Sequence, residues 1–371
     1  MVTSYQEAMS IFRTGTTRFW FVVLLVVAFA APLRLSNDLE LLFVASFAYA
    51  IGAIGLNLVT GYAGQISLGH AFFLAVGAYT AAVVSSASRG GVYGFGISEV
   101  LIWLPIAGLM AALFGLIVGP IATRLRGLYL AIVTLGLVFV GEHVLREWNS
   151  LTGGIGFGRS APAGTLLGFN LKASGEVFGM DIPANTRLYW FTLVCLIVLA
   201  FGAKNLIRSR YGRAFAAVRD RDIAAEIMGV NLTRTKLIAF AVSSFYAGIA
   251  GALLGLRIAN IEPTNYNLLL SILFIAMVLI GGGASIAGSI IGGLVIGLLP
   301  RLSEPLTDFL TPVLNALLFW RSSDNFPLDE FELRTMVYGA ALIFFLLVEP
   351  RGIYGLWIRV RNYWKAFPFS Y

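Results

Sequence analysis

Two glycine-rich segments interrupt the apolar sequence with side chains that can bind a polar solute. They are residues 55–79, GLNLVTGYAGQISLGHAFFLAVGAY, and residues 278–297, VLIGGGASIAGSIIGGLVIG. Such interruptions are typical of broken membrane helices, whose ends offer backbone N–H groups to a substrate carboxylate. We therefore expect both segments to line a solute pathway. The residues predicted to form it are Asn57, Gly61, Gly64, Gln65, Ser67, His70, Gly281, Gly282, Gly283 and Ser285.

Close helix packing would produce the same glycine pattern. Glycines at these spacings let membrane helices approach one another, and a single histidine such as His70 is more typical of a hydrogen-bonded residue of the bundle than of a ligand. An internal repeat is a further possibility, because the segments align at an offset of 220 residues. The identical pairs are Gly61 and Gly281, Ile66 and Ile286, Leu74 and Leu294, and Gly77 and Gly297.

A second polar feature is the charged segment 204–236, KNLIRSRYGRAFAAVRDRDIAAEIMGVNLTRTK. Within it, Asp222 can cap a two-turn helix over residues 223–228, and Gly229 can end that helix in the left-handed conformation. Apolar residues four positions apart give this helix one apolar side. A short amphipathic helix flanked by arginines can dock on a partner, or it can lie in the lipid headgroup layer.

The sequence lacks the motifs of common catalytic sites. None of its four lysines completes a GxxxxGK[ST] phosphate loop, and neither of its two histidines lies in an HExxH zinc motif. There is no GxSxG motif, and the single cysteine, Cys195, can form no intrachain disulfide. We therefore expect no catalytic or metal-binding residues, and any ATP hydrolysis would have to occur on another chain.

Glu142 and Arg146 are a charged pair near one end of an apolar run. They are four residues apart, so one helix face carries both and an ion pair can form. An interfacial pair that anchors the helix explains them best. A proton relay would need a chain of such groups across the membrane, and the sequence contains none, which weakens any proton-driven mechanism.

Membrane helices must position these residues. Of the 371 residues, 58% are hydrophobic and 12% are charged, and the apolar runs approach the roughly 20 residues that span a bilayer. We expect an all-α polytopic membrane protein with about ten transmembrane helices, some of them broken. The expected spans are 19–33, 39–59, 66–86, 97–119, 127–145, 188–203, 237–258, 268–280, 286–300 and 333–348.

The charges orient these spans. With the N-terminus inside, the inner segments hold sixteen Lys/Arg and five Asp/Glu, whereas the outer segments hold ten and fourteen. An excess of Lys/Arg marks the cytoplasmic side, so the basic composition reflects orientation and does not indicate nucleic acid binding. We expect cytoplasmic ends 1–18 and 349–371 around a transmembrane domain 19–348. Its predicted loops are 204–236 on the cytoplasmic side and 147–187 and 302–332 on the outer side.

Five motifs follow one another in an order that is specific in combination. They are GLNLVTGYAGQISLGHAFFLAVGAYTAA, GLYLAIVTLG, LTGGIGFG, the loop with IAAEIMGVN, and the terminal EPRGIYGLWIRVRNYWKAFPFSY. Together they resemble the LivM-type permease family of branched-chain amino-acid ABC transporters, from about residue 41 to residue 371. The stretch 299–332 departs from the family by being longer and more acidic, which puts in doubt how the outer face meets a partner.

The resemblance implies a permease subunit of an ATP-driven importer for branched-chain or related amino acids. One permease would form half of the translocation pathway in the inner membrane, beside a related permease or a second copy. Two cytoplasmic ATPases would hold ATP and Mg²⁺, so this chain needs no cofactor, and an extracytoplasmic solute-binding protein would deliver the substrate. The coupling helix that docks on an ATPase would comprise Asp222, Ile223, Ala225, Glu226, Ile227, Met228 and Gly229.

Other functions are compatible with the same sequence. The family resemblance also allows a permease for urea or short amides. An ion-coupled secondary transporter, or a membrane scaffold or receptor without transport, would belong to a different class. Solute flux and its energy source distinguish these alternatives.

Overall fold

The computed structural model describes residues 15–89, 92–125, 127–154, 158–177, 180–318 and 352–366, with six further residues between 336 and 347. The longer helices are α2 (Gly15–Ala30), α3 (Asn37–Asn57), α4 (His70–Ser85), α5 (Val100–Arg124), α6 (Leu128–Glu147), α8 (Ala184–Arg208), α9 (Arg210–Asp220), α11 (Leu232–Arg257), α12 (Leu268–Gly281), α13 (Ile286–Leu318) and α15 (Gly352–Ala366).

Shorter elements connect these helices. The short helices are η1 (Ala31–Leu33), the π-helical η2 (Leu58–Tyr62), α7 (Asn149–Thr152), α10 (Asp222–Ile227) and η3 (Pro263–Tyr266). The strands are β1 (Ala87–Arg89), β2 (Val92–Phe95), β3 (Arg159–Ser160), β4 (Thr165–Leu166), β5 (Phe169–Asn170), β6 (Gly175–Val177), β7 (Met180–Ile182) and β8 (Asn260–Ile261). They form four antiparallel pairs, β1–β2, β3–β8, β4–β5 and β6–β7.

The predicted all-α polytopic membrane fold is confirmed. In the described residues, six helices are long and apolar enough to cross a membrane, and three shorter apolar helices accompany them. These nine elements correspond to nine of the ten spans expected from the sequence. Ten of the sixteen residues of the tenth expected span, 333–348, lie outside the described residues.

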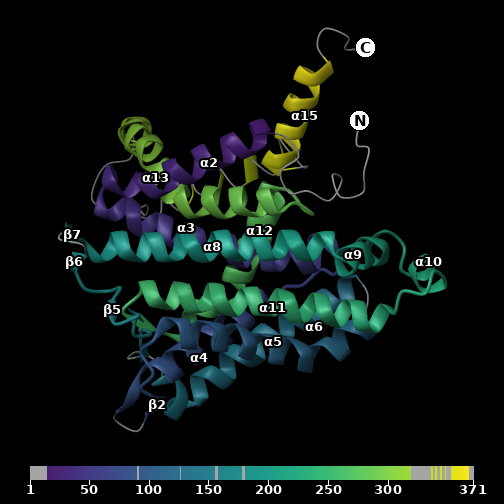
Figure 1. Ribbon diagram of the computed structural model, residues 1–371, viewed down its shortest axis with the longest axis horizontal. Helices are drawn as coiled ribbons and strands as arrows, with labels where there is room; N and C mark the ends of the chain where they lie inside the picture. The colour runs from purple at the N-terminus through teal and green to yellow at the C-terminus, as the bar shows by residue number, and fades with distance from the viewer. Residues whose placement is uncertain are drawn as a thin grey trace.

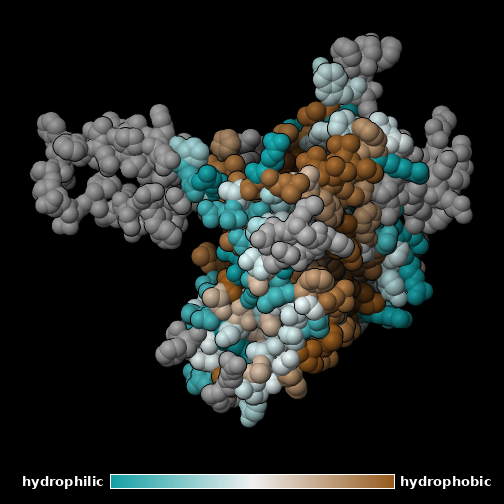
Figure 2. All heavy atoms as spheres, turned by 60° about the vertical axis from the view of Figure 1, so that its left-hand side comes forward, coloured by the Kyte–Doolittle hydropathy of each residue, from teal (hydrophilic) through white to brown (hydrophobic). Residues whose placement is uncertain are grey.

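Helices α3, α8, α11 and α12 run roughly side by side along the long axis of the molecule, whereas α15 extends away from them (Figure 1). Helices α9 and α10 lie at one end, which we call the α10 end, and strands β2 and β5–β7 lie at the other, the strand end (Figure 1). Helix α11 is central and contacts α3, α4 and α5. Figure 2 shows a brown apolar surface beside a more hydrophilic region, as expected for helices that meet lipid.

Backbone contacts hold the central helices together. A side chain on Gly77 of α4 would collide with the backbone of Gly248 in α11, and one on Gly251 would collide with the backbone of Leu74. A side chain on Gly293 of α13 would likewise collide with the backbone of Ala50 in α3. Small residues let membrane helices approach this closely, and close approach is a main source of their packing energy. The central glycines therefore do serve close packing, one of the alternatives that the sequence left open.

Two sequence-based boundaries need correction. Helix α13 passes Pro300 and continues to Leu318, so the first part of the predicted outer loop 302–332 is helical. Proline removes one backbone donor, which often ends a helix in water but is tolerated in membrane helices. The rest of that loop lies outside the described residues, whereas the predicted loop 147–187 corresponds to α7 and the strands β3–β7.

Candidate functional site

The first glycine-rich segment forms a break between α3 and α4. Helix α3 passes into the π-helical η2, and an irregular stretch, residues 63–69, precedes α4. Gly64 in this stretch has a φ of +69°, a conformation that glycine adopts without a steric penalty. Helix α4 has 16 residues, or about 24 Å at 1.5 Å per residue, which is less than a bilayer core of about 30 Å. The break therefore lies within the depth of the helix bundle.

The second glycine-rich segment forms a similar break between α12 and α13. Gly282 and Ala284 have φ values of +114° and +56°, and Ser285 caps the next helix by accepting a hydrogen bond from the Gly288 N–H at 3.0 Å. The offset of 220 residues pairs Ala284 with Gly64, which also has a positive φ. This correspondence agrees with the internal repeat suggested by the sequence.

Asn57 joins the two breaks. Its Nδ2 donates to the Ser285 carbonyl at 2.9 Å and to the Ser289 hydroxyl at 2.7 Å, while its Oδ1 accepts from the Ala284 N–H at 2.9 Å. The side chain is 1% exposed, and protein groups use both of its polar atoms. Asn57 therefore has a direct structural role in holding the strained Ala284 backbone.

Hydroxyl groups accept hydrogen bonds from several N–H groups at the start of α4. The Leu68 N–H donates to Thr134 Oγ1 at 2.9 Å, the Ala71 N–H to Ser271 Oγ at 2.9 Å, and the Gly69 N–H to Ser67 Oγ at 3.3 Å. The sequence-based reasoning missed Thr134 and Ser271, because only the fold brings them to this helix end. These three N–H groups are bonded within the chain and are not open to a substrate.

His70 and Gln65 are buried polar side chains of the first break. The His70 ring stacks on Phe274 with the ring centroids 4.9 Å apart and hydrogen-bonds the Gly52 backbone, but its Nε2 has no partner in the described residues. Gln65 is 5% exposed, and neither of its amide atoms has a partner in the described part of the chain. Both predicted pathway residues therefore retain unused hydrogen-bonding groups.

The charged loop contains the predicted short helix, one residue earlier than expected. Helix α10 spans Asp222–Ile227, so the residue that precedes its first turn is Arg221 and not Asp222. Gly229 follows the helix with a φ of +85°. The Asp222 carboxylate accepts from the adjacent Ile223 N–H at 2.9 Å, a local bond that allows Asp222 to belong to the helix. Assignments of helix ends commonly differ by one residue.

Helix α10 presents apolar side chains at the end of the molecule. Ile223, Ile227 and Met228 are 64%, 81% and 83% exposed, whereas Ala225 is buried. Figure 1 shows α10 projecting beyond the membrane helices. Three large exposed apolar side chains on a projecting helix and at its C-terminal end are typical of a protein interface.

Helix α9 connects this loop to the first break. Arg219 donates from Nη1 to the Gly61 carbonyl at 3.1 Å, and a Cβ on Gly64 would lie 2.8 Å from the Arg219 side chain. A small apolar cluster of Phe215, Ala63 and Ala239 lies beside this contact and is separate from the main core. The break thus contacts the α9–α10 corner through backbone and side chains.

A cavity of about 240 Å³ lies at this corner. Its walls are residues 63–65 of the first break, the α5–α6 junction at Leu125, Gly127 and Leu130, residues 218–222, and Lys236 of α11. Lys236 is 6% exposed. The cavity therefore combines one unsatisfied amide, charges of both signs and an apolar wall.

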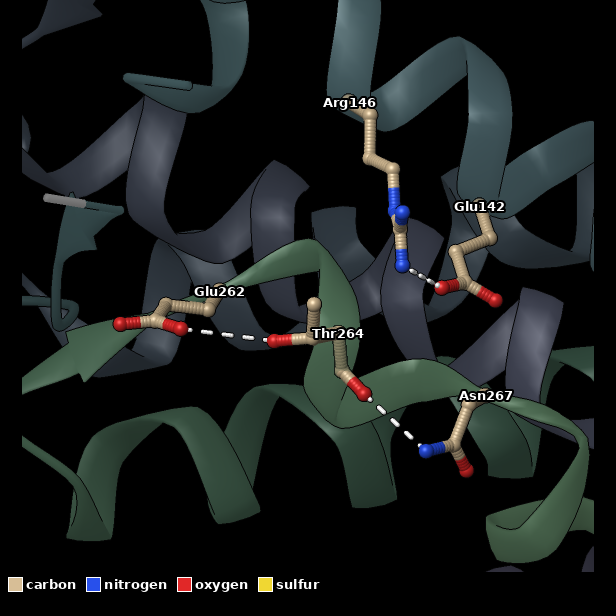
Figure 3. Close-up of polar contacts among 5 residues, drawn as sticks. All are labelled: Glu142, Arg146, Glu262, Thr264 and Asn267. Atoms are coloured by element: carbon tan, nitrogen blue, oxygen red, sulfur yellow. Dashed lines mark hydrogen bonds and ion pairs between the residues drawn. The ribbon is translucent and has the colours of Figure 1, made fainter. Parts of the chain in front are cut away.

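A second polar group lies where α6 leads into α7 and α11 leads into α12 (Figure 3). Arg146 and Glu142 of α6 form the predicted ion pair at 2.5 Å. Across from them, Thr264 Oγ1 donates to the Glu262 carboxylate at 3.4 Å, and Asn267 Nδ2 donates to the Thr264 carbonyl at 3.2 Å. No local sequence pattern marks Glu262, Thr264 or Asn267, which lie in the connection from α11 to α12.

Arg159 stabilises the strand end. Its guanidinium donates to Leu151 O at 2.6 Å, to Ala82 O at 3.2 Å and to Ser86 Oγ at 2.7 Å, and also to Tyr93 O. The residue is 3% exposed, and burial lowers the pKa of its guanidinium. This buried cation therefore ties β3 to α4, α7 and β2. In the described residues, no cluster of three or more His, Cys, Asp or Glu side chains could hold a metal ion.

Comparison with known proteins identifies relatives over most of the chain. The family model described as "Branched-chain amino acid transport system / permease component" matches residues 39–346. The LivM permease protein of the high-affinity branched-chain amino acid transport system of Escherichia coli is 31% identical over 339 residues, covering 86% of this chain and 77% of that protein. The LivH permease protein of Salmonella typhimurium is 28% identical, covering 83% and 91%.

Another relative is named for a different substrate. The AraH permease protein of the L-arabinose transport system of Escherichia coli is 28% identical, covering 67% of this chain and 71% of that protein. No solved structure matches the chain.

Proposed function

Because the chain belongs to the family of branched-chain amino acid transport permease components, we propose that it is the permease subunit of an ATP-driven ABC importer for branched-chain or related amino acids. The LivM and LivH relatives carry this substrate in their names. The chain would form half of the translocation pathway, and a related permease or a second copy would form the other half.

The single structural observation that carries this proposal is the exposed apolar surface of α10. Ile223, Ile227 and Met228 lie on a charged loop at the end of the helix bundle, where water alone would disfavour them. In an ABC importer this helix would insert into a groove on a cytoplasmic ATPase. Two such ATPases would bind ATP and Mg²⁺, and ATP-driven closure would move α10 and the α9 helix attached to it.

The proposed orientation puts the α10 end and both termini in the cytoplasm and the strand end outside the inner membrane. The excess of Lys/Arg in the inner segments supports it. An extracytoplasmic solute-binding protein would then deliver the amino acid at the strand end. The polar group of Glu142, Arg146, Glu262 and Asn267 would lie near that side of the membrane.

We propose that the two breaks line the inner part of the pathway. Gln65 and His70 would contact solute with their unused groups, and the exposed Gly64 and Gly283 would let it pass close to the backbone. Ser67, Gly61, Gly281, Gly282 and Ser285 would shape the breaks. Asn57 would act indirectly, by fixing the two breaks to each other.

Reconstitution tests the proposal. The chain is placed in proteoliposomes with the two ATPases, the partner permease and the solute-binding protein that the proposal requires, and uptake of radiolabelled leucine is followed with and without ATP. We expect uptake only with ATP and binding protein. Ile227→Asp, Glu226→Lys and Gly229→Val should abolish ATP-driven uptake while the chain still reaches the membrane.

Thr233→Asp is the matched control, because Thr233 is an exposed residue of the same loop that lies in the first turn of α11 and not in α10. It should leave uptake near the wild-type rate. Uptake driven by a proton or sodium gradient without ATPases would refute the proposal in favour of a secondary transporter. Uptake of urea or a short amide in place of leucine would keep the ABC mechanism and replace the substrate.

A further inference from the structure

Helix α15 extends away from the bundle, and its first turn packs at the second break. A Cβ on Gly352 would lie 2.5 Å from the Gly282 nitrogen, and Ile353 packs against the main core. Beyond this turn, α15 extends across the direction in which α8 and α11 run (Figure 1). Because α8 and α11 have the length and composition to cross a membrane, a helix that extends across them lies along the membrane plane.

The length and charge of α15 are those of a helix that does not span a membrane. Its 15 residues extend about 22 Å at 1.5 Å per residue, whereas a bilayer core is about 30 Å thick. Arg359 and Arg361 lie in the middle of the helix at exposed positions, and charged side chains at the centre of a bilayer are costly. The helix therefore meets either water or the surface of the membrane.

One side of α15 carries an apolar stripe. Ile353, Trp357, Val360 and Trp364 follow one another at spacings of four, three and four residues, which places them on one helix face, and Leu356 adjoins them. Ile353 packs against the main core, whereas Trp357 and Trp364 are 59% and 70% exposed, and Leu356 and Val360 are exposed as well. An apolar stripe of this size is costly in water, so it requires an apolar partner.

The charges of this segment indicate which partner. At 100° per residue, Arg361 and Arg359 fall on the two edges of the apolar stripe, and residues 351–371 contain four Lys/Arg and no Asp/Glu. Tryptophan and tyrosine are enriched where a membrane meets water, and arginine can reach the headgroups while its aliphatic part stays in an apolar layer. Basic amphipathic helices of this kind bind anionic lipids.

We propose that α15 is a membrane-surface helix that binds anionic lipid. Trp357, Val360 and Trp364 insert between the lipid headgroups, and Arg361 and Arg359 bind the lipid phosphates. The direction of α15, its apolar stripe and its excess of positive charge agree on this partner. The proposal depends neither on transport nor on an ATPase.

Spin labels on the two sides of α15 test the insertion. The full chain is reconstituted in nanodiscs of three parts phosphatidylcholine to one part phosphatidylglycerol, with Cys195→Ala removing the single native cysteine. Trp364→Cys then places a label on the apolar stripe, and Asn362→Cys places one on the opposite side of the helix. The ratio of relaxation by oxygen, which dissolves in lipid, to relaxation by a water-soluble nickel chelate should be about tenfold higher at residue 364.

Two further label positions make this measurement independent of one tryptophan. Leu356→Cys is a second position on the apolar stripe and should resemble Trp364→Cys. Ile117→Cys gives the reference for a label in lipid, because Ile117 is exposed on α5, a helix long enough to cross a membrane. Labels at residues 356 and 364 that nickel reaches as readily as it reaches residue 362 would overturn the proposal.

Photo-crosslinking tests the preference for anionic lipid. Phosphatidylglycerol and phosphatidylcholine with the same diazirine on an acyl chain are compared at equal content, and labelled peptides that contain residues 352–366 are counted. We expect the anionic lipid to label them at least about tenfold more, and Arg361→Gln to lower this preference about fivefold. Arg213→Gln is the matched control, because it removes the same charge from an exposed position of α9, and it should leave the preference unchanged. Equal labelling by the two lipids in the wild type would refute the role of charge.

Added subunits distinguish lipid from a protein partner. The nickel accessibility of labels at residues 356 and 364 is measured before and after the ATPases and the partner permease are added. Low accessibility in nanodiscs of the chain alone, unchanged by the addition, supports the lipid surface. Accessibility that falls only after the addition would identify a protein interface and overturn the proposal. None of these measurements requires transport, so failure of the proposed function would not affect them.

Discussion

Replacing Asn57 with alanine tests whether the two helix breaks depend on one side chain. The substitution removes two donated hydrogen bonds, to Ser285 and Ser289, and the acceptor of the Ala284 N–H. It also leaves a small void, because the residue is 1% exposed. Ala284 keeps its positive φ of +56° without the bond that holds it.

The expected loss of stability follows from these contacts. Hydrogen bonds between membrane helices contribute about 0.6 kcal/mol each on average, so three give about 2 kcal/mol. An unpaired buried N–H adds about 1 kcal/mol or more, for a total of about 3 kcal/mol. With an unfolding entropy of about 2.1 cal/mol/K per residue, a chain of 371 residues should melt roughly 4 °C lower.

The assay is the thermal unfolding of the purified chain in nanodiscs, with Asn265→Ala as control. Asn265 is exposed in η3, and such surface substitutions change stability by about 0.5 kcal/mol or less. Ala284→Gly should be nearly neutral alone, because relief of the strained φ offsets the flexibility of glycine. In the Asn57→Ala background, Ala284→Gly should restore about 1 kcal/mol of the free energy of unfolding. The reason is that residue 284 then keeps its positive φ without the hydrogen bond from Asn57, so it gains most from glycine.

A melting temperature within about 1 °C of the wild type would refute this reasoning, because it falls far short of the decrease expected from the lost bonds. So would a failure of Ala284→Gly to couple to Asn57→Ala. A direct substrate contact predicts the opposite combination, unchanged stability with an altered KM for uptake. The two roles of Asn57 are therefore separable in one set of variants.

Three further predictions address other parts of the molecule. Gly251→Val should prevent folding of the α4–α11 pair, because the valine side chain would collide with the Leu74 backbone. Size-exclusion chromatography should show the loss of folded protein. Gly136→Val is the control, since no atom would meet its Cβ. Arg159→Met should cost about 2–3 kcal/mol by leaving buried carbonyl groups unpaired, and hydrogen exchange should rise in Val92–Phe95. Unchanged exchange would contradict the role assigned to Arg159. Arg219→Gln should weaken the contact with the Gly61 carbonyl, so that a spin label on η2 becomes more mobile, whereas Arg213→Gln at an exposed position of α9 should leave its spectrum unchanged.

The sequence predicts what depends on local pattern. Nine spans follow from runs of apolar residues, and the helix α10 followed by Gly229 follows from helix-forming residues before a glycine. The Glu142–Arg146 pair follows from its spacing of four. Each of these features is decided within a few turns of chain, so sequence alone suffices.

The remaining features depend on residues far apart in the chain. Asn57 hydrogen-bonds Ser289, which is 232 positions away in the chain, and Ala71 hydrogen-bonds Ser271, which is 200 positions away. No local sequence pattern therefore shows whether Asn57 holds the two breaks together or contacts solute. The cavity likewise exists only where residues 63–65, the α5–α6 junction and residues 218–222 converge. The extension of α13 beyond Pro300 was missed for another reason, since proline is a weaker stop signal in membrane helices.

The backbone contacts of the central glycines also divide the molecule mechanically. Helices α3, α4, α11 and α13 touch through main-chain atoms at Gly77, Gly251 and Gly293, and such surfaces cannot slide without collision. Helix α6 instead meets α4 through the Phe72 ring on Gly141 and the Thr134 hydroxyl that accepts from the Leu68 N–H. Helix α8 is joined to α3 by the Thr186 hydroxyl, which donates to the Glu40 carboxylate. A movement of the bundle would therefore carry α3, α4, α11 and α13 together as one rigid unit.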